Sequence, residues 1–364
     1  MRRLNIVALL LLAAGVAVWF WQSRDSSSSA RLLNTNAVAP IARLDAHDPW
    51  ERYAASRAEQ RAKQEIPGST SNVFERINSG DFDVALTAEQ RAVYFQRHGT
   101  NAETLLAMQR VEDIKLAAQL FPDDPRVQFA ALTRDVFPEA RREWLDRFKQ
   151  SAPDNAMADY LSAREYFREG NSEKALAEFT AAAAKPHFTD YSVSQIQNME
   201  EAQLSAGRNV AEAKLAAASH LHVPQSKMLR DIADGLQTMY AQHAASGDVV
   251  AGEATARMIS SFGQRLFADS ESPIILNQYT GMRIESQLLK TLPPDSQPEW
   301  LNQTVQERLD EFKAFKKTGS DLLQEQERMI QRGDESQIIG FYDRLKLQGE
   351  WKALLWLQSQ TAKR

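Results

Sequence analysis

The chain has 364 residues, a net charge of -5 and no cysteine. The lack of cysteine excludes disulfides, thiolate zinc sites, cysteine nucleophiles and lipidation at a lipobox cysteine. The acidic balance argues against a general cationic surface for nucleic acid. The chain has 15 glycines and 13 prolines and is rich in Ala, Leu, Gln and Glu, which favours an all-α protein of one extended or two compact domains.

The amino terminus has the features of a membrane anchor. An uncharged apolar run extends from Leu4 to Trp21 and follows Arg2 and Arg3. The run is long enough to span a hydrocarbon core of about 30 Å, and its terminal aromatic residues suit the membrane–water interface. We therefore expect residues 1–22 to anchor the chain, single-pass, in the inner (plasma) membrane. The arginines favour a cytoplasmic amino terminus, with the body in the periplasm or outside the cell.

A cleaved signal peptide is the alternative for this segment. Such a peptide has a shorter apolar core, followed closely by a small-x-small cleavage site. Here the run ends in bulky aromatic residues, and the site Ala37-Val38-Ala39 is distant and followed by Pro40. An uncleaved anchor is the favoured interpretation.

Residues 23–72 have the composition of a flexible tether. The run Ser26–Ser29 has no side chain to bury, and the residues as far as Pro40 show no hydrophobic period, so we expect disorder there. A short helix is compatible with the spacing of apolar residues in 48–65. The sequence Pro-Gly-Ser-Thr at 67–70 then breaks the chain.

The folded body is expected to begin near Val73. Thr87, with a glutamine three residues later, predicts a capped helix that ends at His98-Gly99. The same pattern at Thr100 and Glu103 predicts the start of a second helix. A third is expected over 111–120.

The most informative stretch extends from Pro153 to Pro186 and predicts two helices joined by a turn. The first covers 157–168, and Gly170 can adopt the left-handed conformation that ends a helix. Ser172 is expected to cap the second helix, and Pro186 to stop it. One face of the second helix is lined by Ala175, Leu176, Phe179 and Ala182.

This stretch resembles a tetratricopeptide repeat (TPR). Ala163 and Tyr166 match the family pattern on the first helix, and Ala175 and Phe179 match it on the second, while Pro186 falls one place early. The match departs at Asp159 and Ser162, where Trp and Leu are usual. The resemblance implies a solenoid of stacked α-hairpins that binds other proteins. An ordinary helical hairpin is the alternative, because it uses the same packing of small against large residues.

The neighbouring units match the repeat less closely. Upstream, Ala140 and Trp144 repeat the spacing of Ala175 and Phe179. Downstream, glycines at 170, 207 and 247 each separate two helical patterns. Further helix pairs are expected over 195–206 with 210–221 and over 227–245 with 249–267, and a single helix over 274–292. We assign 73–292 to a TPR-like helical repeat domain of stacked α-hairpins.

Residues 293–364 form a C-terminal helical region that is expected to cap this array. The longest helical pattern runs from Trp300 to Gln331, and Gly319 marks a point where that helix could bend or divide. A short helix follows Gly333. The last helix, 350–360, carries Trp351, Leu354, Leu355 and Trp356. It is expected to close the stack, and an exposed docking helix is the sharper alternative.

The sequence contains no pattern that predicts catalysis, a metal site or a cofactor. His220 and His222 point in different directions on a helix, and Gly-rich phosphate loops and a nucleophile elbow are absent. Acidic pairs such as Glu200-Glu201 have no companion motif. We therefore expect no catalytic residue, no metal ion and no cofactor.

One helix carries a small basic group, Arg141, Arg142, Arg147 and Lys149. The favoured interpretation is a solvated face balanced by Glu139, Glu143 and Asp146. Binding of acidic lipid or of a peptide carboxylate is the alternative.

If the repeat is real, the ligand face of the family can be transferred by position. The resemblance then implies groove residues Met157, Tyr160, Arg164 and Phe167, and in the next unit Ser194, Gln197, Glu201 and Leu204. These side chains would bind an extended peptide or a partner helix. The alternative is that Tyr160 and Phe167 pack in the core.

Together these features predict a membrane-anchored, TPR-like protein–protein interaction scaffold, an assembly factor or a chaperone-like adaptor at the cell envelope. Its partners would be proteins or peptides, and the membrane through its first helix, but not nucleic acid. Two alternatives remain open. One is a helical enzyme or ligand-binding protein with a site between hairpins. The other is a membrane-anchored steric foldase for a secreted enzyme, which would share the anchor, the tether and the helical body.

Overall fold

The computed structural model describes residues 85–221, 223–268 and 274–361. The described residues all belong to one unit of the chain, Val73–Arg364. Within the described ranges every regular element is a helix, and an isolated bridge between residues 155 and 187 is the single pairing of extended backbone. The all-α class expected from composition is confirmed for this part of the chain.

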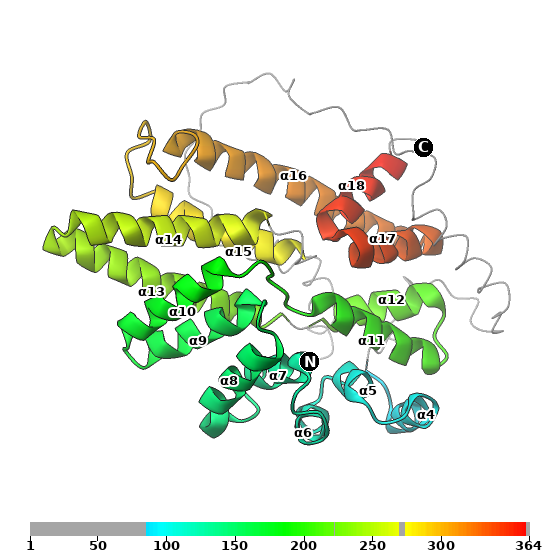
Figure 1. Cartoon of the computed structure of the whole chain (residues 1–364). Coiled ribbons are helices and arrows are strands. Elements are labelled where there is room, and N and C mark those ends of the chain that lie inside the picture. Colours follow the sequence, from blue (N-terminus) through cyan, green and yellow to red (C-terminus); the bar gives the residue numbers. More distant parts are fainter. Residues whose placement is uncertain (1–84, 222, 269–273, 362–364) are drawn as a thin grey trace, which may run out of the picture. The chain divides into compact units, whose positions relative to one another are not determined.

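The helices follow one another along the chain from α4 to α18 (Figure 1). Their bounds are α4 (Ala88–His98), α5 (Ala102–Ala107), α6 (Val111–Leu120), α7 (Pro125–Thr133), η1 (Pro138–Ala140), α8 (Arg141–Ser151), α9 (Ala156–Arg168), α10 (Ser172–Ala184), α11 (Ser192–Ser205), α12 (Val210–Ser219), α13 (Gln225–Ser246), α14 (Val249–Ala268), α15 (Ile275–Leu289), α16 (Val305–Arg332), α17 (Glu335–Gln348) and α18 (Glu350–Thr361).

The expected anchor (1–22), tether (23–72) and short helix (48–65) lie outside the described residues. Among the helices of the described part, none combines the length and apolarity that crossing a bilayer requires. The longest, α16, carries charged side chains along its whole length.

The hairpin α9–α10 has the turn that the sequence predicts. Gly170 has φ +72°, a conformation that costs a glycine little. The N–H of Asn171 donates to the carbonyl of Tyr166 (2.8 Å), and that of Gly170 donates to Phe167 (3.1 Å), which is the Schellman pattern. Gly207 and the glycine at 247 also have positive φ, after α11 and α13. The glycine markers therefore locate three of the hairpin turns correctly.

Some predicted helix starts are correct and others are displaced by a residue. The Thr87 capping box is present, with reciprocal hydrogen bonds to Gln90. The predicted box at Thr100 and Glu103 is wrong, because Asn101 caps α5 and pairs with Thr104. Helix α10 is capped by Asn171 instead of Ser172. Asparagine caps as well as serine or threonine, so adjacent candidates cannot be separated by residue type.

The long C-terminal helix starts later than expected and is not divided. Thr304 caps α16 in a capping box with Glu307, so the predicted start at Trp300 is wrong. The helix continues through Gly319. A Cβ on Gly319 would lie 2.1 Å from the hydroxyl oxygen of Tyr279, so the glycine permits α15 and α16 to approach closely. Gly319 therefore allows close packing between α15 and α16, and the expected bend or division of the helix at this residue is wrong.

The helices stack in an order that departs from chain order. Hairpin α9–α10 packs against α8 on one side and, through α9, against α13 on the other. The next hairpin in sequence, α11–α12, packs instead with α4, α5 and α17 (Figure 1). From α5 the packings run through α6, α7, α8, α9, α13, α14, α15, α16, α18, α17, α12 and α11, and then return to α5. This part of the chain is therefore held together by a closed succession of pairwise packings.

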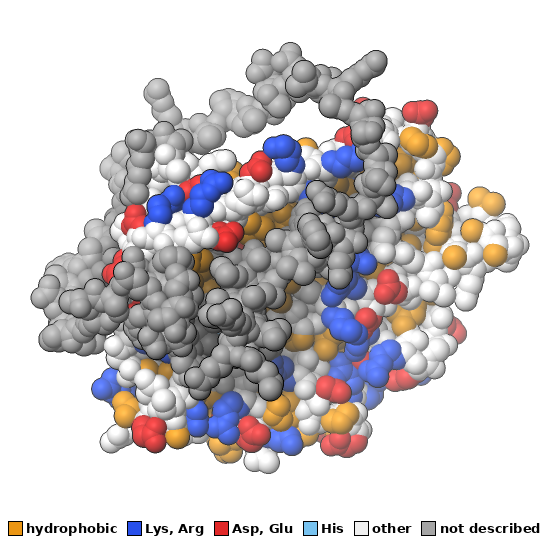
Figure 2. Space-filling view, turned by 180° about the vertical axis from the view of Figure 1, so that it is seen from behind, with side chains coloured by type: hydrophobic (Ala, Val, Ile, Leu, Met, Phe, Trp, Pro, Cys, Tyr) orange, Lys and Arg blue, Asp and Glu red, His pale blue; other side chains and the backbone are white. Residues whose placement is uncertain are grey.

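One core cluster joins α7–α10 with α13–α15. Its centre is aromatic: the ring of Tyr160 lies 5.3 Å from that of Phe179 and 4.7 Å from that of Phe262, between centroids. Phe179 belongs to the face of α10 that the sequence lines with Ala175, Leu176 and Ala182, and it is 2% exposed. Figure 2 shows one face of the molecule, and on its coloured part Lys and Arg side chains lie among Asp and Glu side chains.

Candidate functional site

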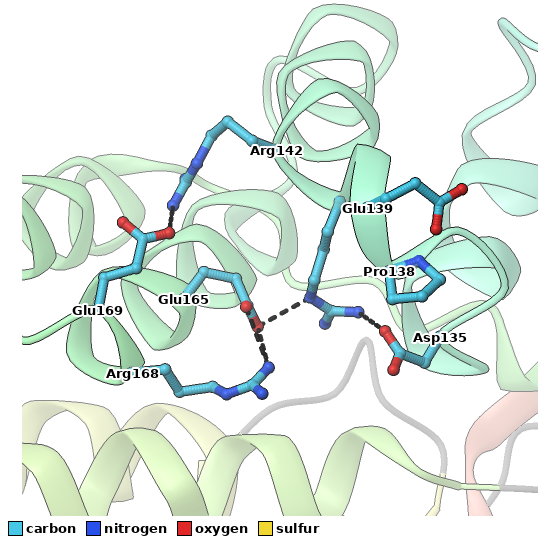
Figure 3. Close-up of a pocket in the computed structure, with 8 residues that line it drawn as sticks. Asp135, Pro138, Glu139, Arg142, Glu165, Arg168 and Glu169 are labelled. Carbon is cyan, nitrogen blue, oxygen red and sulfur yellow. Dashed lines mark hydrogen bonds and ion pairs between the residues drawn. The ribbon is translucent and has the colours of Figure 1, made fainter.

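The candidate site is a polar pocket of about 430 Å³ where the connection from α7 to α8 meets α9. Figure 3 shows its charged side chains. Four acids and three arginines line it together with one proline: Asp135, Glu139, Glu165, Glu169, Arg141, Arg142, Arg168 and Pro138.

The wall of the pocket is formed by the turn between α7 and η1. Asp135 has φ +51°, a left-handed conformation that Asp tolerates better than most residues, and Val136 closes the turn with a hydrogen bond to the Ala131 carbonyl (2.9 Å). Pro138 then starts η1, and α8 follows directly. This sharp reversal brings Asp135 to within 2.9 Å of Arg141, between Oδ1 and Nη1.

Arg141 connects the turn to α9. Its Nη1 also donates to the carbonyl of Leu132 (2.8 Å), and its Nε lies 2.8 Å from Oε1 of Glu165. The Arg141 side chain is only 10% exposed. Its Nη2 is buried and has no hydrogen-bond partner. Its Nε is also buried and makes no hydrogen bond, although it lies close enough to Glu165 for an ion pair. Nη1 therefore fixes the Arg141 side chain, while Nε and Nη2 keep unsatisfied N–H groups.

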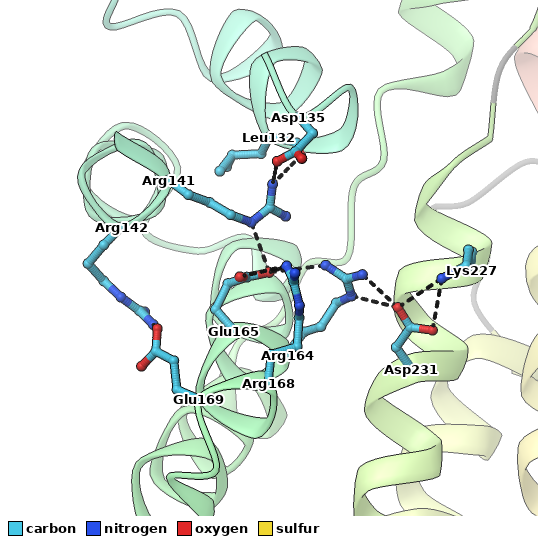
Figure 4. Close-up of polar contacts among 10 residues, drawn as sticks. All are labelled: Leu132, Asp135, Arg141, Arg142, Arg164, Glu165, Arg168, Glu169, Lys227 and Asp231. Atoms are coloured by element: carbon cyan, nitrogen blue, oxygen red, sulfur yellow. Dashed lines mark hydrogen bonds and ion pairs between the residues drawn. The ribbon is translucent and has the colours of Figure 1, made fainter. Parts of the chain in front are cut away.

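Glu165 is shared by three arginines (Figure 4). Besides Arg141, Nη1 of Arg164 lies 3.0 Å and Nη1 of Arg168 3.1 Å from its carboxylate oxygens. Arg164 also binds Asp231 of α13, at 2.6 and 2.8 Å. One carboxylate thus neutralises part of the charge of three guanidinium groups, and the cluster extends from the α7–α8 turn through α9 to α13.

Arg142 occupies a separate edge of the pocket. Its guanidinium donates to Oγ of Ser162 (2.9 Å) and to Glu169 (3.1 Å). Its Cζ also lies 3.9 Å from the ring centroid of Tyr166, within the range of a cation–π interaction. Arg142 is therefore bound by two side chains of α9 and by Glu169, the residue that follows it, and it stabilises the packing of α8 on that helix.

The structure separates the basic group noted in the sequence. Arg147 pairs with Glu143 at 2.8 Å on the exposed face of α8, as the balanced-face interpretation predicts. Arg141 does not belong to that face, because it points into the pocket and pairs with residues of other elements. Lys149 pairs with Glu178 of α10.

The expected groove residues do not line one surface. Met157 and Tyr160 are buried in the core, at 0% and 1% exposure, so neither can contact a partner. Arg164 and Phe167 face α13, where Phe167 occupies the space left by Gly235. The physical reason is that α13, and not α11, packs along α9.

Of the groove residues expected on α11, Gln197 contacts α17. Gln197 donates to Glu201 (2.7 Å) and accepts from Lys346 (2.7 Å). Ser194 and Leu204 are half-buried. Of the groove residues transferred from the repeat family, only Arg164 takes part in the pocket's cluster of charges.

Sequence reasoning missed Asp135, Glu165, Arg168 and Asp231. Glu165 and Arg168 lie three residues apart on a predicted helix, which is a weak signal for an ion pair. Lys227 and Asp231 lie four residues apart on α13, which is a similar weak signal, but no local pattern reports the pairing of Asp231 with Arg164, 67 residues away. Asp135 pairs with Arg141 only because the turn between them reverses the chain.

The described residues bring together no group of three or more His, Asp or Glu side chains suited to holding a metal ion. Comparison with protein-family models, with curated proteins and with solved structures gives no significant match.

Proposed function

We propose that this protein is a TPR-like scaffold that binds another protein and is held at a membrane by its first helix. The observation that supports it best is the stacking of short α-hairpins with a charged pocket on their flank. Stacked helical pairs present large preformed surfaces, and they bind polypeptides through such surfaces. The stacked helices support a binding role only by analogy with other helical repeat proteins. The charged side chains of the pocket are the groups that could recognise a particular partner.

The pocket suits a polypeptide surface better than an extended polyanion. Arginine is favoured at interfaces because its planar fork binds carboxylates and backbone carbonyls with little rearrangement. The arginines of the pocket lie among acidic side chains, and the whole chain has a net charge of -5. A partner with mixed polar groups would therefore meet no net repulsion at this surface.

The membrane part of the proposal rests on the apolar run from Leu4 to Trp21 behind Arg2 and Arg3. An anchor of this kind would leave the helical body on the far side of the inner membrane, where it would act as an assembly factor or adaptor. The proposed topology predicts that protease added to the outside of spheroplasts degrades the body but spares a short amino-terminal fragment.

A test of the scaffold proposal is site-specific photo-crosslinking of the full chain in its native membrane. Glu139 lines the pocket and is exposed, so a crosslinking residue there would face a partner. Lys313 on α16, with 72% side-chain exposure, is the control position. The proposal expects a discrete adduct at position 139 that is absent at 313. The captured protein, once purified, should also bind the purified full chain.

Identical adducts at both positions, or none at either, would contradict the scaffold proposal. A ligand-binding protein is then the second candidate, because a volume of about 430 Å³ lies in the range of small-molecule sites.

A further inference from the structure

The guanidinium groups in the pocket have more N–H donors than the described residues satisfy. Nη2 of Arg141 is buried and has no partner. Arg168 makes its hydrogen bonds through Nη1 alone, to Glu165, and its side chain is 60% exposed. A buried donor without a partner is costly, because the water that it leaves is not replaced. An acceptor oxygen brought by a ligand would remove that cost.

The charge of the pocket limits what that acceptor can be. Its lining has four acids and three arginines, for a net charge of -1. Arg164 and Lys227 add two positive charges and Asp231 one negative charge, which brings the extended cluster to zero. A site of balanced charge with spare guanidinium donors suits a single negative charge. A phosphate dianion would face the repulsion of the same carboxylates.

We infer that this pocket binds one carboxylate group of a polypeptide, with Arg168 as the accessible donor and Nη2 of Arg141 as the inner donor. Carboxylate oxygens match the planar donor fork of arginine, and the Glu165 carboxylate already forms ion pairs with these two residues. Asp and Glu side chains and a free chain end offer the same chemistry. The inference rests on the proposed function, since it specifies which group of the partner is recognised.

Arg168 can be changed without disturbing the core, and the chain contains a close match for it. Arg328 has 58% side-chain exposure and pairs with Glu325 three residues earlier, at 2.9 Å. Arg168 has 60% exposure and pairs with Glu165 three residues earlier, at 3.1 Å. The variants Arg168→Gln and Arg328→Gln therefore remove equivalent surface charges, but only the first alters the pocket.

The test is saturation-transfer NMR on the purified full chain with small probes. The probes are N-acetyl-glutamate amide, its glutamine analogue, N-acetyl-alanine with a free carboxylate, and N-acetyl-phosphoserine amide. We expect a carboxylate probe to bind and the glutamine analogue not to bind. Arg168→Gln should weaken binding about tenfold, which corresponds to the loss of one charged hydrogen bond, and Arg328→Gln should leave it unchanged.

The probes also identify the source of the carboxylate. Binding of the glutamate probe assigns the site to an acidic side chain, whereas binding of the alanine probe alone assigns it to a chain end. Glu165→Gln provides a second variant. The Glu165 carboxylate competes with the probe for the two donor arginines, so its removal should tighten carboxylate binding.

Tighter binding of the phosphoserine probe, binding that survives Arg168→Gln, or no binding of any probe would overturn the inference. These outcomes are distinct from failure of the scaffold proposal. If a partner is crosslinked at position 139 but no carboxylate probe binds, only the inferred carboxylate recognition is rejected. Carboxylate binding with no crosslinked partner rejects the scaffold.

Discussion

Two ionic clusters in the same helical unit have opposite character. The pocket cluster (Asp135, Arg141, Arg164, Glu165, Arg168 and Asp231) opens to solvent and has unsatisfied donors. The buried cluster (Glu200, Lys214, Asp343 and Lys346) lies between α11, α12 and α17, and its side chains are at most 7% exposed. The comparison indicates which cluster holds the fold together and which is available for binding.

The buried cluster is balanced and satisfied internally. Nζ of Lys214 lies 2.7 Å from Glu200 and also binds Asp343, while Lys346 binds the other oxygen of Glu200 at 2.6 Å. Burial works to raise the pKa of Glu200, but Lys214 and Lys346 outweigh it and hold that pKa below its ordinary value. Two cations and two carboxylates thus join three helices with no group left for a ligand.

The largest expected effect comes from removing one member of the buried cluster. Lys214→Met leaves Glu200 and Asp343 buried beside a single cation, Lys346. Breaking a buried pair in this way costs about 3–5 kcal/mol. Urea unfolding of the full chain should show this as a lower midpoint at an unchanged slope.

Lys317→Met is the control for this prediction. Lys317 pairs with Asp321, but its side chain is 80% exposed, so its loss should change the midpoint little. Equal shifts for the two variants would mean that the buried cluster does not hold α12 to α17.

A smaller effect is expected in the pocket cluster. Glu165→Gln removes the carboxylate that three arginines share but keeps its shape, and the Glu165 side chain is 11% exposed. Arg141 would retain Asp135, and Arg164 would retain Asp231. We therefore expect a loss of about 2 kcal/mol in the free energy of unfolding, measured in the same way.

The control is Glu169→Gln, which removes a 55% exposed partner of Arg142. It should cost clearly less. A loss for Glu165→Gln as large as that for Lys214→Met would erase the distinction between the two clusters.

The two clusters also show how far sequence reasoning reaches. Hairpin α9–α10 was predictable because its signals are local: the glycine at 170 ends one helix and the small and aromatic residues of α10 recur at helical spacing. The expected groove failed for a non-local reason, since it assumed that α11 follows α9 in space. The helix that packs there is α13, and it supplies Asp231 to Arg164.

The same limit applies to both charge clusters. Lys214 and Asp343 are separated by 129 residues, and Arg164 and Asp231 by 67. Helical periodicity assigns a residue to one face of its own helix, but it does not say which distant helix will cover that face. The acidic pair Glu200-Glu201 has no companion motif in the sequence, yet the structure buries Glu200 completely.

A third carboxylate sharpens the comparison, because no lysine or arginine in the described part of the chain pairs with it. Glu350, at the start of α18, accepts a hydrogen bond from the N–H of Ile275 at 2.9 Å. Burial raises the pKa of Glu350 to about 7, and the Ile275 hydrogen bond only partly opposes this. Burial, and to a smaller extent the charge of Glu350, raises the pKa of Tyr279 to about 12.

The sign of the pH effect follows from that raised pKa. Between pH 4.5 and 7 the folded state holds a proton that the unfolded state has released, so the contribution of Glu350 is full below pH 4.5 and is lost as pH rises through 7. Glu350→Gln keeps an acceptor for Ile275 and removes the titration. We expect the variant to be more stable than the wild type at pH 8, by about 3 kcal/mol, because each tenfold change in proton affinity is worth about 1.4 kcal/mol, and equal to it near pH 4.5. Unfolding midpoints of both proteins across this range measure the difference, and parallel curves would show that Glu350 titrates in the folded protein as it does in the unfolded chain.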